Sequence, residues 1–165
     1  MTLHDFNTLP RERLAEELAK CCSSSAWVDK MLNFIPAEDL VELLEDAEEC
    51  WWACSEKDWK EAFAGHPRIG DRDIIKNKSA EWASNEQAGV KGASEATLTA
   101  FLNANEEYEK KFGYIFIVCA TGKSAEEMLG MLNIRLQNSP EVEIEIAAEE
   151  QSRITKLRIE KLLES

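Results

Sequence analysis

Side chains that carry proton chemistry near neutral pH are scarce in this sequence. It has only two histidines: His4 near the N-terminus, and His66 near the middle of the chain between a glycine and a proline. The signatures of nucleotide-binding, calcium-binding and hydrolytic sites are also absent, including G-x-G-x-x-G, the P-loop, H-E-x-x-H, the EF-hand loop and G-x-S-x-G. We therefore expect neither a nucleotide-dependent enzyme nor a zinc enzyme.

Long apolar runs and an excess of basic charge are missing as well. No apolar stretch approaches the roughly 20 residues that cross a bilayer, and the first residues do not resemble a signal peptide. The net charge of −13 opposes binding to nucleic acid or to an anionic membrane surface. The five cysteines form no C-x-x-C, which favours reduced thiols. We expect a cytoplasmic protein with no nucleic-acid or membrane partner.

Helical periodicity dominates the 165 residues, of which 44% are hydrophobic. Apolar residues at i, i+3 and i+4 predict helices in the segments Leu14–Cys21, Trp27–Ile35, Pro36–Trp51, Trp59–Phe63, Leu98–Phe112, Leu129–Leu136 and Val142–Leu162. Suitable first residues are Asn7 or Thr8, Ser55, Ser94 and Ser124, and left-handed glycines at positions 65 and 113 are expected to end two helices. The predicted fold is all-α: a compact multi-helix bundle in which residues 1–165 form a single domain.

One apolar run departs from this pattern. Residues 114–120 are continuously apolar and partly β-branched, which on propensity alone favours a buried strand. No second strand of similar quality is present to pair with it, and an unpaired strand cannot satisfy its backbone. We therefore expect a buried extended or helical segment whose backbone N–H groups are available to hold a ligand.

His66 is the best candidate for acid–base chemistry, because imidazole titrates near neutral pH. Gly65 and Pro67 favour a helix end directly before it, and the helix dipole there stabilises a protonated ring. Residues 66–78 carry four cations against two carboxylates, which would attract a small anion. Taken alone, His66 is equally compatible with a residue that only marks a loop.

Other polar groups are less distinctive. Ser84, Glu86 and Gln87 lie at the end of a short predicted helix, residues 79–87, and are able to face one pocket, although Glu86 alone resembles any surface acid. The inner face of the last predicted helix is expected to contain Val142, Ile146, Glu150 or Gln151, Ile154, Leu157 and Leu162. The glutamates at positions 141, 143, 145, 149 and 150 are expected to be mostly a solvated acidic face. Cys119 is a conceivable nucleophile, but its apolar surroundings favour an inert thiol.

Four motifs occur in a fixed order along the chain. They are His66-Pro67-Arg68-Ile69-Gly70, Ser84-x-Glu86-Gln87, Phe116-Ile117-Val118-Cys119-Ala120-Thr121-Gly122-Lys123-Ser124, and Ile154-x-x-x-Arg158-Ile159-x-x-Leu162. With Phe6-Asn7 and the region of Trp27, this ordered set resembles the OHCU decarboxylase family over nearly the whole chain. OHCU is 2-oxo-4-hydroxy-4-carboxy-5-ureidoimidazoline, a late intermediate of urate breakdown. One conservative departure is Ile159, where members of that family usually carry leucine.

The resemblance implies an all-α homodimer that converts OHCU to (S)-allantoin and CO2 without a cofactor. It implies that His66 is the catalytic acid or base and that Glu86 is catalytic through orienting the substrate. The substrate contacts it implies are Pro67, Ser84, Gln87, Ile117, Val118, Cys119, Ala120, Thr121 and Arg158. Arg153 remains an alternative to Arg158, since a small register error would exchange them.

Two other functions are compatible with the residues. A non-enzymatic helical module would use its acidic faces to bind basic partners. A helical hydrolase would use Cys119 as its nucleophile.

Overall fold

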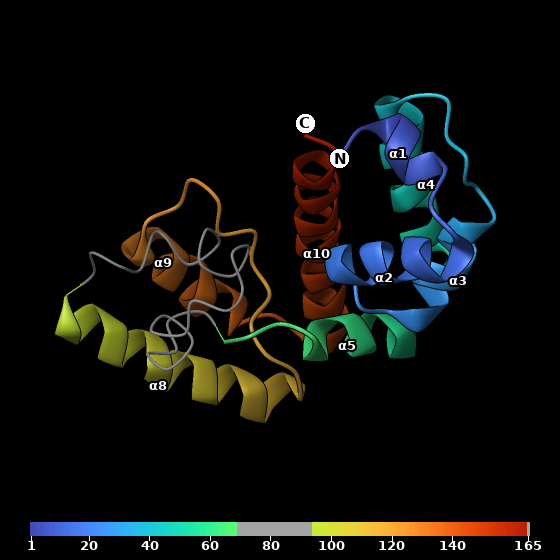
Figure 1. Ribbon diagram of the computed structural model, residues 1–165. Helices are drawn as coiled ribbons and strands as arrows, with labels where there is room; N and C mark the ends of the chain where they lie inside the picture. The colour runs from blue at the N-terminus through green and yellow to red at the C-terminus, as the bar shows by residue number, and fades with distance from the viewer. Residues whose placement is uncertain (69–93, 165) are drawn as a thin grey trace. The chain divides into compact units, whose positions relative to one another are not determined.

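The computed structural model describes residues 1–68 and 94–164, and every regular element in these ranges is a helix (Figure 1). The all-α prediction is confirmed. Contacts divide the chain into two compact units. Unit 1 contains residues 1–65 and 151–165, and unit 2 contains residues 66–150. No described helix combines the length and apolar character needed to span a bilayer.

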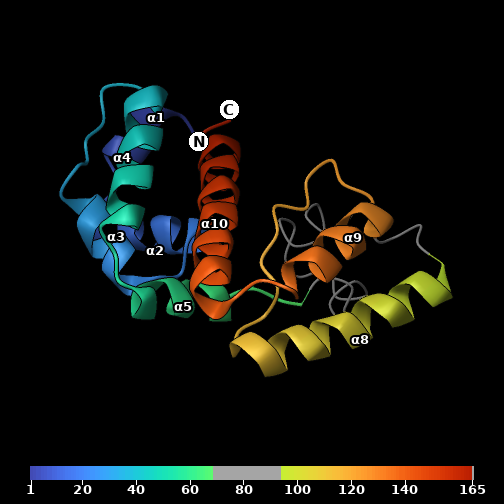
Figure 2. The same cartoon turned by 180° about the vertical axis from the view of Figure 1, so that it is seen from behind.

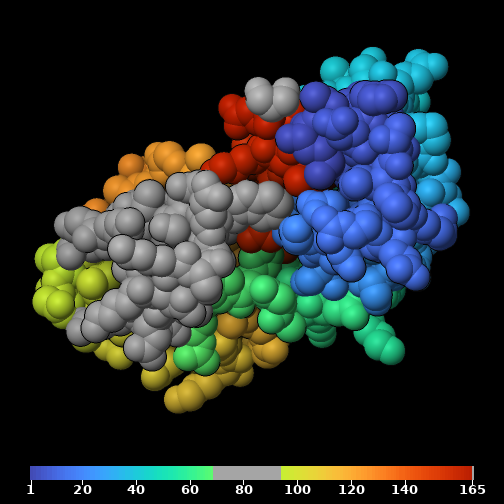
Figure 3. Space-filling model, viewed as in Figure 1, coloured from blue at the N-terminus to red at the C-terminus, as the bar shows by residue number. Residues whose placement is uncertain are grey.

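Unit 1 is built from the N-terminal helices and the C-terminal part of the last helix. Its elements are α1 (Leu3–Asn7), α2 (Arg11–Cys21), α3 (Ser25–Leu32), α4 (Leu40–Trp52), α5 (Glu56–Ala64) and the end of α10 (Pro140–Leu162). Helix α3 packs against α2, α4 and α5. The space-filling view shows the N-terminal helices as one continuous packed surface (Figure 3).

Large apolar side chains fill the interior of unit 1. Those exposed by 2% or less include Phe6, Leu18, Trp27, Met31, Leu43, Trp51 and Phe63. The Trp27 indole also donates from Nε1 to the Ala47 carbonyl at 3.0 Å, which joins α3 to α4. The apolar periodicity thus identified the inner faces of α2 to α5, although Phe34, expected on a helix, lies beyond the end of α3 and is 43% exposed.

The N-terminal segment departs from expectation. Residues Leu3–Asn7 form a short helix with a capping box between Thr2 and Asp5. Asn7 does not cap α2, which begins after Pro10 without a side-chain cap. The Asn7 amide instead exchanges two hydrogen bonds with the backbone of Ala37, at 2.8 and 3.0 Å. Local capping patterns in the sequence cannot predict this long-range contact.

Gly65 ends α5 for a reason other than the predicted one. Its φ of −79° is right-handed, so the left-handed expectation is wrong. A Cβ at this position would lie 2.1 Å from Ser23 Oγ and 3.0 Å from Ser23 Cβ. The close approach of Ser23 therefore favours glycine at position 65. This contact lies directly before His66 in the chain.

Unit 2 contains α8 (Glu95–Phe112), α9 (Ala125–Arg135) and the beginning of α10. Helices α8 and α9 pack side by side, as both ribbon views show (Figure 2). Ser94 and Ser124 cap them as predicted, and Gly113 ends α8 with a φ of 84°. The core of this unit joins Phe101, Tyr108, Phe116, Met128 and Leu132.

The apolar run after α8 is neither strand nor helix. Residues 115–120 connect α8 to the turn before α9, and residues 116–120 are buried. This outcome confirms a buried non-helical segment and excludes the helical alternative. Its backbone polar groups therefore need partners outside regular secondary structure.

Candidate functional site

His66 directly follows Gly65, the C-cap of α5, and it is half-buried together with Pro67. The capping box between Ser55 and Asp58 begins this helix, and buried Ala62 and Phe63 fix its orientation in unit 1. The predicted placement of His66 just beyond a helix C-terminus is therefore confirmed. An imidazole there is partly shielded from water and still accessible, as a proton donor requires.

Arg68 lies two residues beyond His66 and is paired with Glu109 of α8. Its Nε donates to Oε1 at 3.0 Å and its Nη2 lies 2.6 Å from Oε2, which is a bidentate arrangement. The sequence predicts Arg68 as one of four cations that would attract an anion. In the structure its guanidinium pairs with Glu109, which connects Arg68 to α8.

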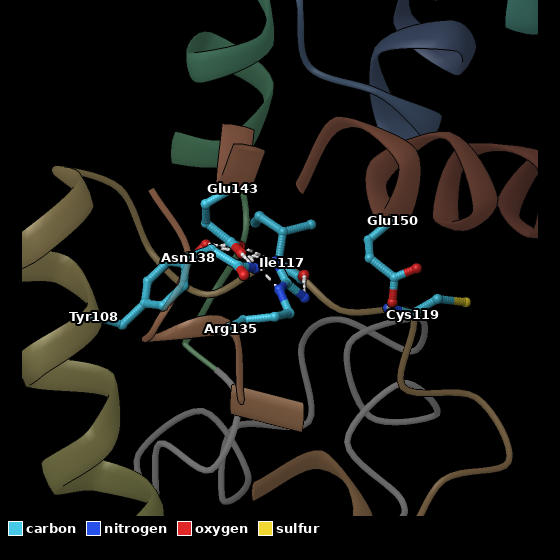
Figure 4. A network of polar contacts seen from close by, with 7 residues as sticks. All are labelled: Tyr108, Ile117, Cys119, Arg135, Asn138, Glu143 and Glu150. Atoms are coloured by element: carbon cyan, nitrogen blue, oxygen red, sulfur yellow. Dashed lines mark hydrogen bonds and ion pairs between the residues drawn. The ribbon is translucent and has the colours of Figure 1, made fainter. Parts of the chain in front are cut away.

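Residues 117–121 are held by charged side chains through their backbone, as Figure 4 shows for Ile117 and Cys119. Arg135 Nη1 donates to the Ile117 carbonyl at 2.7 Å, and Glu150 Oε1 accepts from the Cys119 N–H at 3.2 Å. Lys123 Nζ donates to the Cys119 carbonyl at 2.7 Å. The Cys119 N–H thus has a protein acceptor, so it differs from the ligand-holding donor that we expected at this position.

Other N–H groups of the same segment differ from that of Cys119. Within the ranges that the structure describes, the N–H groups of Ile117, Val118, Ala120 and Thr121 meet no protein acceptor. Val118 and Ala120 are at most 4% exposed, and Thr121 is exposed. Leaving a buried N–H without an acceptor is costly, and such groups are rare in folded proteins. These donors support a ligand-binding role for the segment.

Glu143, near the start of α10, is the centre of the buried polar network in Figure 4. Its carboxylate contacts Arg135 Nη2 at 2.6 Å and Nε at 2.8 Å, and accepts from the Tyr108 hydroxyl at 2.5 Å. Asn138 adds a further donor at 3.1 Å. Burial raises the pKa of Tyr108 far above its usual value, against the opposing effect of Arg135, so the phenol stays protonated and donates. The network joins α8, α9, α10 and Ile117.

The burial of Glu143 and Glu150 corrects the prediction of a mostly solvated acidic face, although it agrees with the alternative that placed Glu150 or Gln151 on the inner face. The exposures of Glu143 and Glu150 are 0% and 3%, whereas Val142, assigned to the inner face, is 49% exposed. A signal was available in the sequence: positions 143, 147, 150 and 154 follow the i, i+4, i+7, i+11 spacing of one helix face, and they include Ala147 and Ile154. At these positions helical periodicity predicts burial correctly, whereas acidic character alone predicts exposure.

The structure describes some of the remaining expected site residues. Ser84, Glu86 and Gln87, with the predicted helix 79–87, lie outside the described residues. Arg158 is half-buried in unit 1, where its Nη1 contacts the Cys21 carbonyl at 3.5 Å, while Arg153 is exposed. Neither arginine belongs to the unit that contains His66 and residues 117–121.

Metal-binding donors do not gather in the part of the chain that the structure describes, where no three His, Cys, Asp or Glu side chains are suitably placed. All five thiols are buried and reduced. Desolvation raises the pKa of Cys21 and of Cys22 to about 12, and that of Cys50 to about 11. Thiols of this kind are poor nucleophiles near neutral pH.

Comparison with protein-family models gives a match that spans most of the chain. The model described as OHCU decarboxylase matches residues 7–160. The uric acid degradation bifunctional protein TTL of Arabidopsis thaliana is 37% identical over 151 residues, which cover 89% of this chain and 46% of that protein. The chain spans less than half the length of the bifunctional relatives that it matches.

Some proteins described only as the decarboxylase match over nearly their full length. The 2-oxo-4-hydroxy-4-carboxy-5-ureidoimidazoline decarboxylase of Halalkalicoccus jeotgali is 25% identical, over 98% of this chain and 92% of that protein. A crystal structure of OHCU decarboxylase in the presence of (S)-allantoin is 36% identical with a TM-score of 0.79, over 91% of this chain and 99% of that one. The likeness therefore includes both sequence and fold.

Proposed function

Since the chain belongs to the OHCU decarboxylase family, which acts in urate degradation, we propose that it removes CO2 from OHCU to form (S)-allantoin. The observation that carries this proposal is the family match across residues 7–160, which includes His66 and the segment 117–121. The family relationship also supports a decarboxylase that needs no cofactor. The activity is expected to persist after exhaustive treatment with EDTA.

The chemistry of OHCU indicates what the site must do. When the bond to the carboxylate breaks, CO2 leaves and the electron pair forms a double bond to the ureido-bearing carbon, while the π pair of the neighbouring carbon–nitrogen double bond moves to nitrogen, which takes a proton; the product is an enol. The ureido-bearing carbon then takes a proton while the hydroxyl becomes a carbonyl. Positioned N–H donors lower the energy of the electron-rich intermediate, and a single proton donor on one face determines the handedness of the product.

We assign these tasks to the residues that the family resemblance indicated. His66 delivers the proton, directly or through water, and Glu86 orients the ureido group or the hydroxyl. Ser84, Gln87 and Pro67 line the substrate. The backbone of Ile117–Thr121 contacts it, with the N–H groups of Val118, Ala120 and Thr121 as donors. Arg158 attracts the carboxylate on binding. Its grip has to be weak, because stabilising the bound carboxylate would raise the barrier to its departure.

The donor geometry of residues 117–121 supports this assignment. Val118 and Ala120 carry buried N–H groups that meet no protein acceptor in the described ranges, as a segment that receives a polar ligand requires. The alternative functions lack comparable support. Glu143 and Glu150 are buried, which weakens an acidic binding face, and the Cys119 thiol is buried at 7% exposure.

The direct test is optical. Purified protein is added to OHCU generated in situ from urate, and optically active allantoin is followed by circular dichroism. We expect rapid formation of the (S)-enantiomer. His66→Ala is expected to keep its helical signal and to lose nearly all turnover, whereas His4→Ala, which removes the other, exposed histidine, is the matched control. Unchanged turnover in His66→Ala would eliminate the proton-donor role.

We also propose that the protein is a cytoplasmic homodimer and that residues 1–165 act as one domain. Sedimentation equilibrium tests the homodimer, for which we expect twice the chain mass of 18.7 kDa. Calorimetry tests the second, since one domain should unfold in a single cooperative transition. Two separate transitions would assign independent stability to the units.

A further inference from the structure

The carbonyl and N–H groups of residues 117–120 point in defined directions. The peptide bond between Ile117 and Val118 is trans, so the Ile117 carbonyl and the Val118 N–H point in opposite directions. The same holds for the Cys119 carbonyl and the Ala120 N–H. A side chain that holds either carbonyl therefore determines where the following N–H points.

Cationic side chains hold both carbonyls. Arg135 donates to the Ile117 carbonyl at 2.7 Å, and Lys123 donates to the Cys119 carbonyl at 2.7 Å. The two N–H groups aimed by these contacts, those of Val118 and Ala120, meet no protein acceptor in the described part of the chain, and both residues are at most 4% exposed. The Ile117 N–H also lacks an acceptor there, but no charged side chain holds the carbonyl of its peptide group. A charged donor on a carbonyl also polarises the peptide group, which strengthens its N–H as a donor.

We propose that Arg135 and Lys123 are positioning residues, which aim and polarise the Val118 and Ala120 N–H groups toward the substrate without touching it. This inference rests on the proposed function. It gives the buried carboxylate of Glu143 a role as well: the ion pair to Arg135, 6% and 0% exposed, prevents the guanidinium from turning away from Ile117. A bidentate guanidinium is suited to this task, since it contacts Glu143 and Ile117 simultaneously.

Arg135 is buried and Lys123 is only half-buried, so a substitution of Lys123 tests the positioning role with less effect on folding. Lys123 is half-buried and lies outside the Glu143 network, so Lys123→Met is expected to fold normally. Arg135→Lys keeps the buried charge beside Glu143 but removes the fork that reaches Ile117. The matched controls are Lys20→Met and Arg13→Lys, whose side chains are 58% and 59% exposed in unit 1.

Each variant is assayed for kcat and KM and is titrated with (S)-allantoin while backbone amides are observed by NMR. In the unmutated protein we expect allantoin to shift the Val118 and Ala120 signals. Lys123→Met should lower kcat roughly tenfold or more, with a smaller change in KM, and should abolish mainly the Ala120 shift. Arg135→Lys should act in the same way through Val118. The control variants should match the unmutated protein.

The outcomes separate this inference from the proposed function. If the unmutated protein does not form allantoin, the proposed function fails and the inference fails with it. If the unmutated protein is active but folded Lys123→Met keeps its kcat and its Ala120 shift, only the positioning role is overturned. Should Arg135→Lys fail to fold, Lys123→Met and the Val118 shift in the unmutated protein decide the result.

Discussion

Arg68 and Glu109 form a bidentate ion pair across 41 positions of sequence, with contacts of 3.0 and 2.6 Å. Arg68 lies two residues after His66, and Glu109 lies on the last turns of α8. The pair therefore connects the candidate catalytic histidine to a helix of unit 2. Its partial exposure, 48% for Arg68 and 24% for Glu109, limits its contribution to stability.

We predict that breaking this pair affects catalysis more than folding. Arg68→Met and Glu109→Gln should each lower the free energy of unfolding by about 1 kcal/mol or less. Each should lower kcat by roughly tenfold, because His66 loses its fixed position. A double-mutant cycle measures the coupling, and the double variant should be little worse than either single one. A loss confined to Arg68→Met would show instead that Arg68 contacts the substrate.

Gly65→Ala should destabilise unit 1 although the backbone there is ordinary. The added Cβ would lie 2.1 Å from Ser23 Oγ and 3.0 Å from Ser23 Cβ, so α5 or the Ser23 segment has to shift. We expect a loss of about 1–3 kcal/mol in urea unfolding. Ser23→Gly should restore most of it in the double variant.

The control for this experiment is Gly130→Ala in α9, where an added Cβ meets nothing within 4 Å. Alanine is the better helix former, so this variant should be neutral or up to about 1 kcal/mol more stable. Equal losses at both glycines would contradict the Ser23 explanation.

Stability should fall at alkaline pH because of two buried thiols. Burial raises the pKa of Cys21 and of Cys22 from 9.0 to about 12. Between these values the unfolded chain loses thiol protons that the folded chain keeps, so stability is fully present below pH 9 and is lost as pH rises toward 12. Each thiol contributes a slope of up to about 1.4 kcal/mol per pH unit.

Urea unfolding of the unmutated protein and of Cys22→Ala between pH 8 and 10.5 measures this effect. The substitution should lower stability at pH 8 and flatten the decline above pH 9. The same decline in both proteins would attribute the alkaline loss to other groups.

Glu86→Ala separates two roles of that carboxylate. If Glu86 orients the substrate in the transition state, kcat and kcat/KM should fall together, by roughly 100-fold. If it only contributes to binding, KM should rise while kcat stays unchanged. Steady-state assays on OHCU generated in situ distinguish the two results.

Local patterns predicted much of the fold. Ser55, Ser94 and Ser124 begin helices, and Gly113 ends one, as expected. These features succeed because a cap or an amphipathic stripe depends on residues within about four positions of one another. Residues 115–120 were likewise identified as buried and distinct, although periodicity could not decide between extended and helical conformations.

Sequence motifs predicted those parts of the site that consist of residues close together in the chain. They could not predict contacts between residues that are far apart in the sequence. The sequence indicated His66 and the segment 117–121, but it concealed the charges that orient that segment. Glu143 and Glu150 looked like surface acids because acidic residues are usually exposed. Their burial depends on Arg135, Tyr108 and the Cys119 N–H, which are 8 to 35 positions away.

Sequence patterns alone predicted most of the helices, the caps at Ser55, Ser94 and Ser124, the position of His66 after a helix end and the family to which the chain belongs. Which charged side chains pair with one another inside the protein depends on its tertiary structure. It placed Arg68 on Glu109, Glu143 on Arg135, and Ser23 against Gly65. The physical reason is that helix formation is governed by near neighbours, whereas the pairing of a charge depends on which distant groups the packed helices bring within about 3 Å of it.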